Sequence, residues 1–159
     1  MLIKVHSAAL NPSDILFMKG KYKVKLPYPY TPGWEGSGTV VAVGPGLTTS
    51  WLLGRRVAFM KKFELATYQR GGAFAEYCVT DFKSCIPLAD DINFEQAASF
   101  YVNPLTAVGM VERMLTLKAK ACIITAAASQ IGRMLIKLCN MNGITPICTV
   151  RRPEQAEML

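Results

Sequence analysis

The sequence predicts a fold of the mixed α/β class, in which a β-rich first half is followed by a strand, a helix and a second strand near the end of the chain. Short β-branched or aromatic runs between glycine and proline clusters fill the first half, and helical spacing of apolar residues begins near residue 94. The 159 residues are 51% hydrophobic and 18% charged, which is enough apolar material for a core.

The first half contains runs whose composition is typical of short strands. Turn-forming clusters separate them, among them Pro29–Gly38 and Gly44–Gly46. Short strands and turns at this spacing favour a small barrel or sandwich. The strands are expected at Leu2–His6, Thr39–Val43, Arg56–Met60 and Phe74–Val79.

The apolar spacing changes in the second half. It predicts helices at Phe94–Ala98 and Thr106–Leu115, with Asn103 and Pro104 interrupting between them. An apolar strand, a helical run that Gly143 ends and a second strand follow, which is the opening of a parallel nucleotide-binding sheet. These three parts are expected at Ala121–Ala126, Ile131–Leu138 and Thr145–Val150. The predicted domain division is therefore 1–93, 94–120 (connecting helices) and 121–159.

Charge and cysteine content narrow the classes of function. The net charge of +7 indicates either a solvated basic surface or a preference for anionic ligands, and no nucleic-acid partner is expected. No apolar run reaches the roughly 18 residues of a membrane span, and no targeting segment is visible. Five cysteines without a CxxC pair predict buried free thiols in a reducing compartment, cytoplasmic or mitochondrial. His6 is the single histidine and is expected to be structural, which leaves no His/Cys zinc cluster at the usual spacings.

Motifs between residues 10 and 46 carry a resemblance to a known family. They are Leu10–Asp14 (LNPSD), Gly20–Tyr22 (GKY), Pro32–Gly36 (PGWEG) and Gly38–Gly46 (GTVVAVGPG). Together they resemble the medium-chain dehydrogenase/reductase family, in the zinc-independent branch that holds quinone oxidoreductases and 2-enoyl thioester reductases. The resemblance implies a GroES-like β-barrel domain followed by the first strand-helix-strand unit of a Rossmann dinucleotide-binding domain.

The resemblance extends over the whole chain, but the chain corresponds to only about half of a family enzyme. Met1 falls where family members have the middle of an early strand, and only Pro153–Leu159 follows the last expected strand. We therefore expect a truncated chain that lacks the extreme N-terminus and the C-terminal half. Its full-length relatives are expected to be homodimers.

The resemblance implies catalytic roles for Tyr22 and Asn11. Tyr22 matches the tyrosine proposed to hydrogen-bond a thioester carbonyl, or to supply a proton, as hydride reaches the β-carbon, and a positioned phenol can stabilise enolate charge. The alternative is that Tyr22 is a rim aromatic of a basic loop. Asn11 lies where relatives line the active-site cleft, and its alternative role is turn formation before Pro12.

The sequence departs from the zinc alcohol dehydrogenases at Trp34. Those enzymes place a metal-binding histidine before the glutamate that matches Glu35, and their catalytic cysteine has no counterpart near Asn11. Phe63–Gly72 is too short for their structural-zinc lobe and has no cysteine. No metal site is therefore expected, and Glu35 is expected to be a structural hydrogen-bonding residue.

Cofactor contacts are implied at two turns. Asn103 and Thr106 could hold the nicotinamide carboxamide or a phosphate, although a polar break between helices is the alternative. The turn Ala126–Gly132 keeps only the last glycine of GxGxxG, but its small residues still let the backbone approach a pyrophosphate. The cofactor-binding residues expected in this turn are Ala127, Ser129, Gln130, Ile131 and Gly132.

A third cofactor contact is implied after the second strand of the parallel unit. NAD-specific proteins place an acidic residue there, whereas this chain has Arg151 and Arg152, whose guanidinium groups would suit a ribose 2′-phosphate. The alternative is a basic cap without a ligand. NADPH is therefore the expected cofactor.

These features predict an NADPH-dependent oxidoreductase that reduces an activated C=C bond, with a trans-2-enoyl thioester of fatty acid metabolism as the favoured substrate. The alternative enzyme is an NADPH quinone oxidoreductase. The alternative of another class is an inactive truncated product that serves as a folded binding or assembly module. If the substrate is an acyl thioester, an acyl carrier protein or coenzyme A is the expected partner, because both are anionic and would be attracted by Lys19, Lys21, Lys23 and Lys25.

Overall fold

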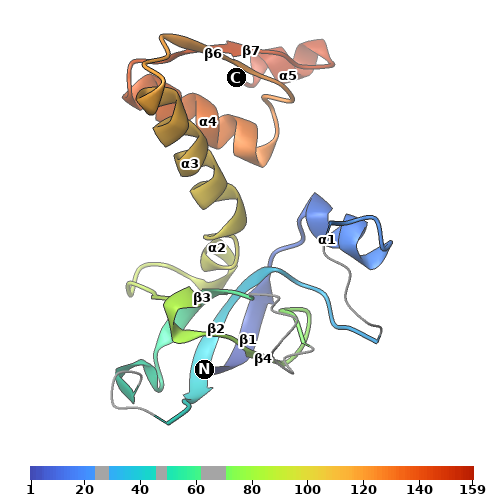
Figure 1. Cartoon of the computed structure of the whole chain (residues 1–159), viewed down its shortest axis with the longest axis vertical. Helices are drawn as coiled ribbons and strands as arrows, with labels where there is room; N and C mark the ends of the chain where they lie inside the picture. The colour runs from blue at the N-terminus through green and yellow to red at the C-terminus, as the bar shows by residue number, and fades with distance from the viewer. Residues whose placement is uncertain (24–28, 46–49, 62–70) are drawn as a thin grey trace. The chain divides into compact units, whose positions relative to one another are not determined.

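The structure is a computed structural model that describes residues 1–23, 29–45, 50–61 and 71–159 (Figure 1). The chain forms two compact units, Met1–Val102 and Asn103–Leu159. Strands and helices occur in both units, so the predicted mixed α/β class is confirmed. The finer division at residues 93 and 120 stays a prediction.

The first unit is built on a five-stranded antiparallel sheet in the order β4-β1-β2-β3-β5 (Figure 1). Strand β3 begins and ends where the sequence predicted. Strand β4 is shorter than predicted, and β5 was not predicted because its three residues are too few for the alternation of a strand to be recognised. The strands are β1 (Leu2–Ala8), β2 (Glu35–Ala42), β3 (Arg56–Met60), β4 (Tyr77–Val79) and β5 (Cys85–Pro87).

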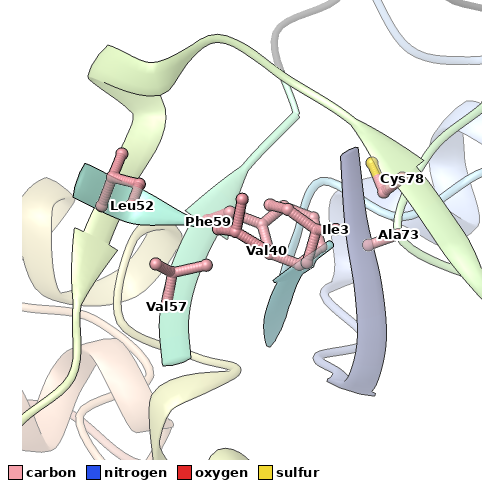
Figure 2. Packing of buried hydrophobic residues seen from close by; sticks show 7 residues of the cluster. All are labelled: Ile3, Val40, Leu52, Val57, Phe59, Ala73 and Cys78. Atoms are coloured by element: carbon pink, nitrogen blue, oxygen red, sulfur yellow. The ribbon is translucent and has the colours of Figure 1, made fainter. Parts of the chain in front are cut away.

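Strand β3 is buried on both faces, because alternate residues of a strand point to opposite sides of the sheet. Val57 and Phe59 join the main apolar cluster, which Figure 2 shows around Phe59, Val40 and Ile3. Ala58 points the other way, into a second cluster with Ala97 and Tyr101. Strand β3 therefore connects the two apolar clusters of the first unit. The main cluster contains Ile3, Val40, Leu52, Val57, Phe59, Ala73 and Cys78.

The helices of the first unit are short. The prediction missed α1 (Pro12–Met18), because its seven residues are fewer than the roughly 11 over which helical spacing can be recognised. It begins at Asn11, whose backbone N–H donates to the Asp14 carboxylate at 2.8 Å, and Pro12 suits the first helical turn. The remaining elements are η1 (Ser50–Leu52), η2 (Phe82–Ser84) and α2 (Phe94–Ala97).

A lysine side chain is buried at the end of β3. Lys61 is only 2% exposed, and its Nζ donates to the carbonyl oxygen of Val79 at 2.6 Å. Burial lowers the pKa of this ammonium group, and the nearby Cys78 opposes that effect.

The second unit has the predicted strand-helix-strand order. The strands β6 (Ala121–Ile124) and β7 (Thr145–Cys148) are parallel, with Ala121 opposite Thr145, and each ends two residues earlier than predicted. The predicted interruption at Asn103 and Pro104 is wrong, because both lie in the first turn of a continuous helix, where proline costs no hydrogen bond. The helices are α3 (Val102–Thr116), α4 (Gln130–Met141) and α5 (Pro153–Glu157).

One face of this two-stranded sheet is covered. Ile124 of β6 packs in a cluster with Val111 of α3 and Leu135 of α4. On the other face, the register-paired Ile123 and Ile147 are 70% and 52% exposed. Within the described residues, none of the helices combines the length and apolar character required to cross a membrane.

Gly38 provides a test of how closely β1 and β2 approach. A Cβ at this position would lie 2.2 Å from the carbonyl oxygen of Lys4, whereas a Cβ at Gly44 would meet nothing within 4 Å. We expect Gly38→Ala to lower the free energy of unfolding by about 2 kcal/mol, because the two strands must separate. Urea unfolding of both alanine variants checks this, and equal midpoints for Gly38→Ala and Gly44→Ala would contradict the described packing.

Candidate functional site

A fully buried carboxylate lies at the start of β2. Glu35 Oε1 accepts a hydrogen bond from the Asn11 side-chain amide at 2.9 Å. Glu35 Oε2 accepts from the backbone N–H groups of Tyr101 and Val102, both at 2.9 Å. Because α3 begins at Val102, the carboxylate binds amide groups that the helix itself cannot satisfy. The expected hydrogen-bonding role of Glu35 is confirmed by these contacts.

Asn11 and Asp14 hold the start of α1 next to this carboxylate. Asn11 is 4% exposed, and its side-chain amide donates to the buried Glu35 carboxylate. The same residue stands at the beginning of α1. Asp14 is fully buried and accepts hydrogen bonds from the backbone N–H groups of Asn11, at 2.8 Å, and Trp34, at 3.2 Å. Burial raises the pKa of the Asp14 carboxyl, and the neighbouring charge of Glu35 adds to the shift, while the backbone hydrogen bonds oppose it.

Tyr22 lies against an aromatic cluster beside this network. Its ring centroid is 5.1 Å from that of Trp34, and Trp34 is 5.3 Å from Phe17 of α1 in an edge-to-face arrangement. Phe17 in turn contacts Tyr30 edge to face at 5.5 Å. Tyr22 is half-buried, so the cluster fixes one side of its ring. The two predicted catalytic residues therefore contact neighbouring residues, Asn11 through Glu35 and Tyr22 through Trp34.

Lysines surround Tyr22 in the sequence. Lys19, Lys21 and Lys23 are exposed. Lys25 and residues 63–70 of the segment Phe63–Gly72 lie outside the described residues.

A separate pocket lies within the second unit, at the carboxyl ends of β6 and β7. Its volume is about 470 Å³. Ligands of parallel α/β sheets bind at this end of the strands, where the N-terminus of the following helix provides unpaired backbone N–H groups. The lining residues are Thr125, Ala126, Ala128, Ser129, Thr149, Val150, Arg151 and Gln155.

In the turn between β6 and α4, the backbone of Gly132 lies close to the backbone of Ala127. Ser129 begins α4, and its hydroxyl oxygen accepts a hydrogen bond from the Gly132 backbone N–H at 3.1 Å. A Cβ at Gly132 would lie 2.4 Å from the carbonyl oxygen of Ala127, so this position requires glycine if the turn is to keep its shape. Ala126 has a φ of +51°, which turns the chain out of the strand.

The structure brings only some of the predicted cofactor residues to the pocket. Ser129 and Arg151 line it. Ala127 is fully buried in the core cluster, Ile131 packs against that cluster, and Gly132 is buried behind the turn. These three residues shape the turn and are not among those that line the pocket.

The remaining predicted residues occupy other positions in the second unit. Gln130 is exposed at the start of α4, where its side-chain oxygen accepts from Arg133. Arg152 is exposed and begins α5. Asn103 and Thr106 lie in the first turns of α3 and are not part of the pocket lining.

Two threonines of the pocket were missed by the sequence analysis. Thr125 and Thr149 each follow the last residue of a parallel strand, and Thr149 connects the two turns: its carbonyl oxygen accepts from Ala127 N at 3.1 Å, and its N–H donates to Ile124 O at 3.0 Å. Their position could have been used to predict them, because ligands of parallel sheets bind at the carboxyl ends of the strands, where these two threonines stand.

No group of three or more His, Cys, Asp or Glu side chains that could hold a metal ion occurs in the described part of the chain. His6 lies on β1, with its ring stacked on Phe94 at 4.5 Å, and its Nδ1 is 3.0 Å from the Ser7 hydroxyl.

Comparison with known proteins connects this geometry to a family. The family described as "Alcohol dehydrogenase GroES-like domain" matches residues 1–90, which is more than half of the chain. The chain belongs to this family. The matched segment contains Glu35, Asn11 and Tyr22, and the resemblance to the medium-chain dehydrogenase/reductases is confirmed.

Several relatives of this chain are named as enoyl reductases or as quinone oxidoreductase-like proteins. The mitochondrial enoyl-[acyl-carrier-protein] reductase of Caenorhabditis elegans is 30% identical over 100% of the chain and 44% of its own length. Quinone oxidoreductase-like protein 2 of Mus musculus is 32% identical over 84% of the chain and 36% of its own length.

Solved structures share the fold. A Mesorhizobium loti protein assigned as an NADPH:quinone reductase is 41% identical with a TM-score of 0.87, over 99% of this chain and 44% of that protein. The quinone oxidoreductase of Thermus thermophilus, also solved in complex with NADPH, is 26% identical with a TM-score of 0.75, over 97% and 45%. The chain spans less than half the length of each of these relatives.

The Glu35 network can be tested by truncating the carboxylate. Glu35→Ala would leave the Asn11 amide and the Tyr101 and Val102 N–H groups buried without their acceptor, so we expect a loss of about 3 kcal/mol in the free energy of unfolding. Denaturant unfolding measures this loss. Glu95→Ala is the control, because that carboxylate is 68% exposed, and a loss no larger than that of the control would refute the structural role.

Proposed function

We propose that this chain provides the catalytic and nucleotide-binding parts of an NADPH-dependent oxidoreductase. The pocket at the ends of β6 and β7 carries the proposal, because it combines a helix N-terminus, a compact turn and an exposed guanidinium group. The names of the enoyl reductase and quinone oxidoreductase relatives support the same class of reaction.

The residues of the pocket fit a phosphorylated dinucleotide. Gly132 places no side chain against the Ala127 carbonyl, so the turn stays compact. Ser129 binds the Gly132 N–H, and the Gln130 and Ile131 N–H groups at the start of α4 would face a pyrophosphate. Arg151 lines the pocket three residues after the end of β7, where its positive charge suits a ribose 2′-phosphate, and the exposed Arg152 follows it in the sequence. When bound, NADPH would supply the hydride.

The favoured reaction is reduction of the C=C bond of a trans-2-enoyl thioester. Addition of hydride to the β-carbon places negative charge on the thioester carbonyl oxygen, and a proton must then reach the α-carbon. The Tyr22 phenol would donate a hydrogen bond to that oxygen and stabilise its charge. The contact with Trp34 would hold the tyrosine ring in position for this. Asn11 would support the site through the Glu35 carboxylate, to which its amide donates.

Reduction of a quinone is the second candidate. It is favoured by the assigned activity of the Mesorhizobium loti protein, with which this chain shares 41% identity. The same NADPH pocket and the same phenol would serve this reaction, since the quinone carbonyl oxygen also gains negative charge.

Cofactor choice tests the pocket. NADPH should raise the thermal unfolding midpoint more than NADH, since only NADPH carries the 2′-phosphate.

The double substitution Arg151→Ala with Arg152→Ala should weaken NADPH binding about tenfold and remove the preference for NADPH over NADH. Arg113→Ala is the control, because this exposed arginine of α3 does not line the pocket. A cooperative transition that NADPH leaves unchanged would overturn the proposal and favour the alternative of a folded module without cofactor function.

A second substitution tests the phenol. Tyr22→Phe should lower the turnover of an enoyl thioester about 100-fold, because only the hydroxyl that stabilises the developing charge is removed. The shift of the unfolding midpoint by NADPH should remain unchanged, and Tyr77→Phe, at an exposed tyrosine of β4, should behave as the unmodified chain. Unaltered turnover in Tyr22→Phe would contradict the catalytic role, and turnover of quinones without turnover of enoyl thioesters would favour the second candidate.

A further inference from the structure

Three cysteines of the second unit differ in their accessibility. Cys139 of α4 is fully buried, Cys122 of β6 is partly buried, and Cys148 at the end of β7 is exposed. The exposure of Cys148 corrects the expectation of buried thiols at this position. It lies within strand β7, opposite Ile124 of β6.

Cys122 and Cys139 are in contact. Their Sγ atoms are 3.6 Å apart, although the residues belong to different elements and are 17 positions apart in the sequence. A disulfide needs a sulfur separation of about 2.05 Å, so the two sulfurs would have to approach by about 1.5 Å. Side-chain rotation and a small shift of the helix against the strand can supply that movement, since Cys122 lies on a strand and Cys139 lies in the last turn of α4.

The two thiols are not equivalent toward an oxidant. Burial raises the pKa of the Cys139 thiol to about 11, and the contact with Cys122 adds to the shift. The fully buried Cys139 is also out of reach of any reagent in solution. Cys122 is partly exposed and therefore meets an oxidant first, with Cys139 next to it as the second thiol.

We propose that Cys122 and Cys139 are a redox pair that hydrogen peroxide converts into a reversible disulfide between β6 and α4. The Cys122 thiolate attacks peroxide and becomes a sulfenic acid as hydroxide leaves. The Cys139 sulfur then attacks the Cys122 sulfur, an S–S bond forms, and the oxygen of the sulfenic acid leaves as water. The two thiols lose two electrons and two protons, and the peroxide is reduced to two molecules of water.

The position of the pair gives the disulfide a defined effect. The covalent loop that it closes contains Thr125, Ala126, Ala128 and Ser129, which line the pocket at the strand ends. Movement of β6 toward α4 would therefore change the turn between them. The proposal itself rests on the thiol contact, and it does not depend on the identity of the pocket's ligand.

Peptide mapping of the whole folded chain tests the pair. Peroxide treatment should lower the intact mass by about 2 Da, and a thiol reductant should restore it. Trypsin leaves Cys122 on the peptide 121–133, but places Cys139 and Cys148 together on 138–151. The experiment therefore uses the exposed-site variant Cys148→Ser, in which a link between these two peptides can only be Cys122–Cys139.

The expected result is a 121–133 to 138–151 link in Cys148→Ser, at the yield of the unmodified chain, and its loss in Cys139→Ala. A link that disappears in Cys148→Ser would overturn the proposal, because Cys148 would then be the partner of Cys122. Oxidation of Cys122 to sulfinic acid without any link would overturn it as well. Because Cys139→Ala opens a space in the core, the result for Cys148→Ser decides the question even if the alanine variant fails to fold.

Discussion

The buried carboxylate of Glu35 is the interaction on which the architecture of the first unit depends. It has no exposed surface, and its two oxygens accept from a side-chain amide at the start of α1 and from two backbone amides where α3 begins. A buried charge is costly unless donors surround it, so the strand and the two helix starts must keep their positions together. The ring of Tyr22 lies against Trp34, the residue before this carboxylate, and its placement therefore depends on the same network.

The second unit achieves its geometry without buried charge. A short parallel pair of strands, a helix with a serine at its start and a glycine behind the turn are enough to expose amide groups at the sheet edge. Small side chains in the turn replace the missing glycines of the usual fingerprint, since Ala126 itself adopts a positive φ. A non-glycine residue in this backbone conformation is strained, so the turn costs more with alanine than with glycine.

Much of this fold could be predicted from the sequence, because β-branched runs and helical spacing are strong where elements are long or buried. Strand β3 and the strand-helix-strand order of the second unit are examples. The short α1 and β5 could not be predicted, since each has too few residues for its repeat to be recognised in the sequence. At the site, Ser129 and Arg151 were found from the motif, whereas Thr149 depends on a strand end whose position the sequence defines only within two residues. The contacts of Glu35 join residues up to 67 positions apart, so no local pattern could reveal them.

The burial of Lys61 has a consequence for chemical labelling. The residue is 2% exposed and its amine donates to the carbonyl oxygen of Val79, so an acylating reagent can reach the amine only after this part of the first unit has opened locally. The lowered pKa has burial as its cause, so the amine regains the reactivity of an ordinary lysine once it is uncovered. The acylation rate at this lysine is therefore limited by that local opening, and it reports the local stability of the first unit without any added probe.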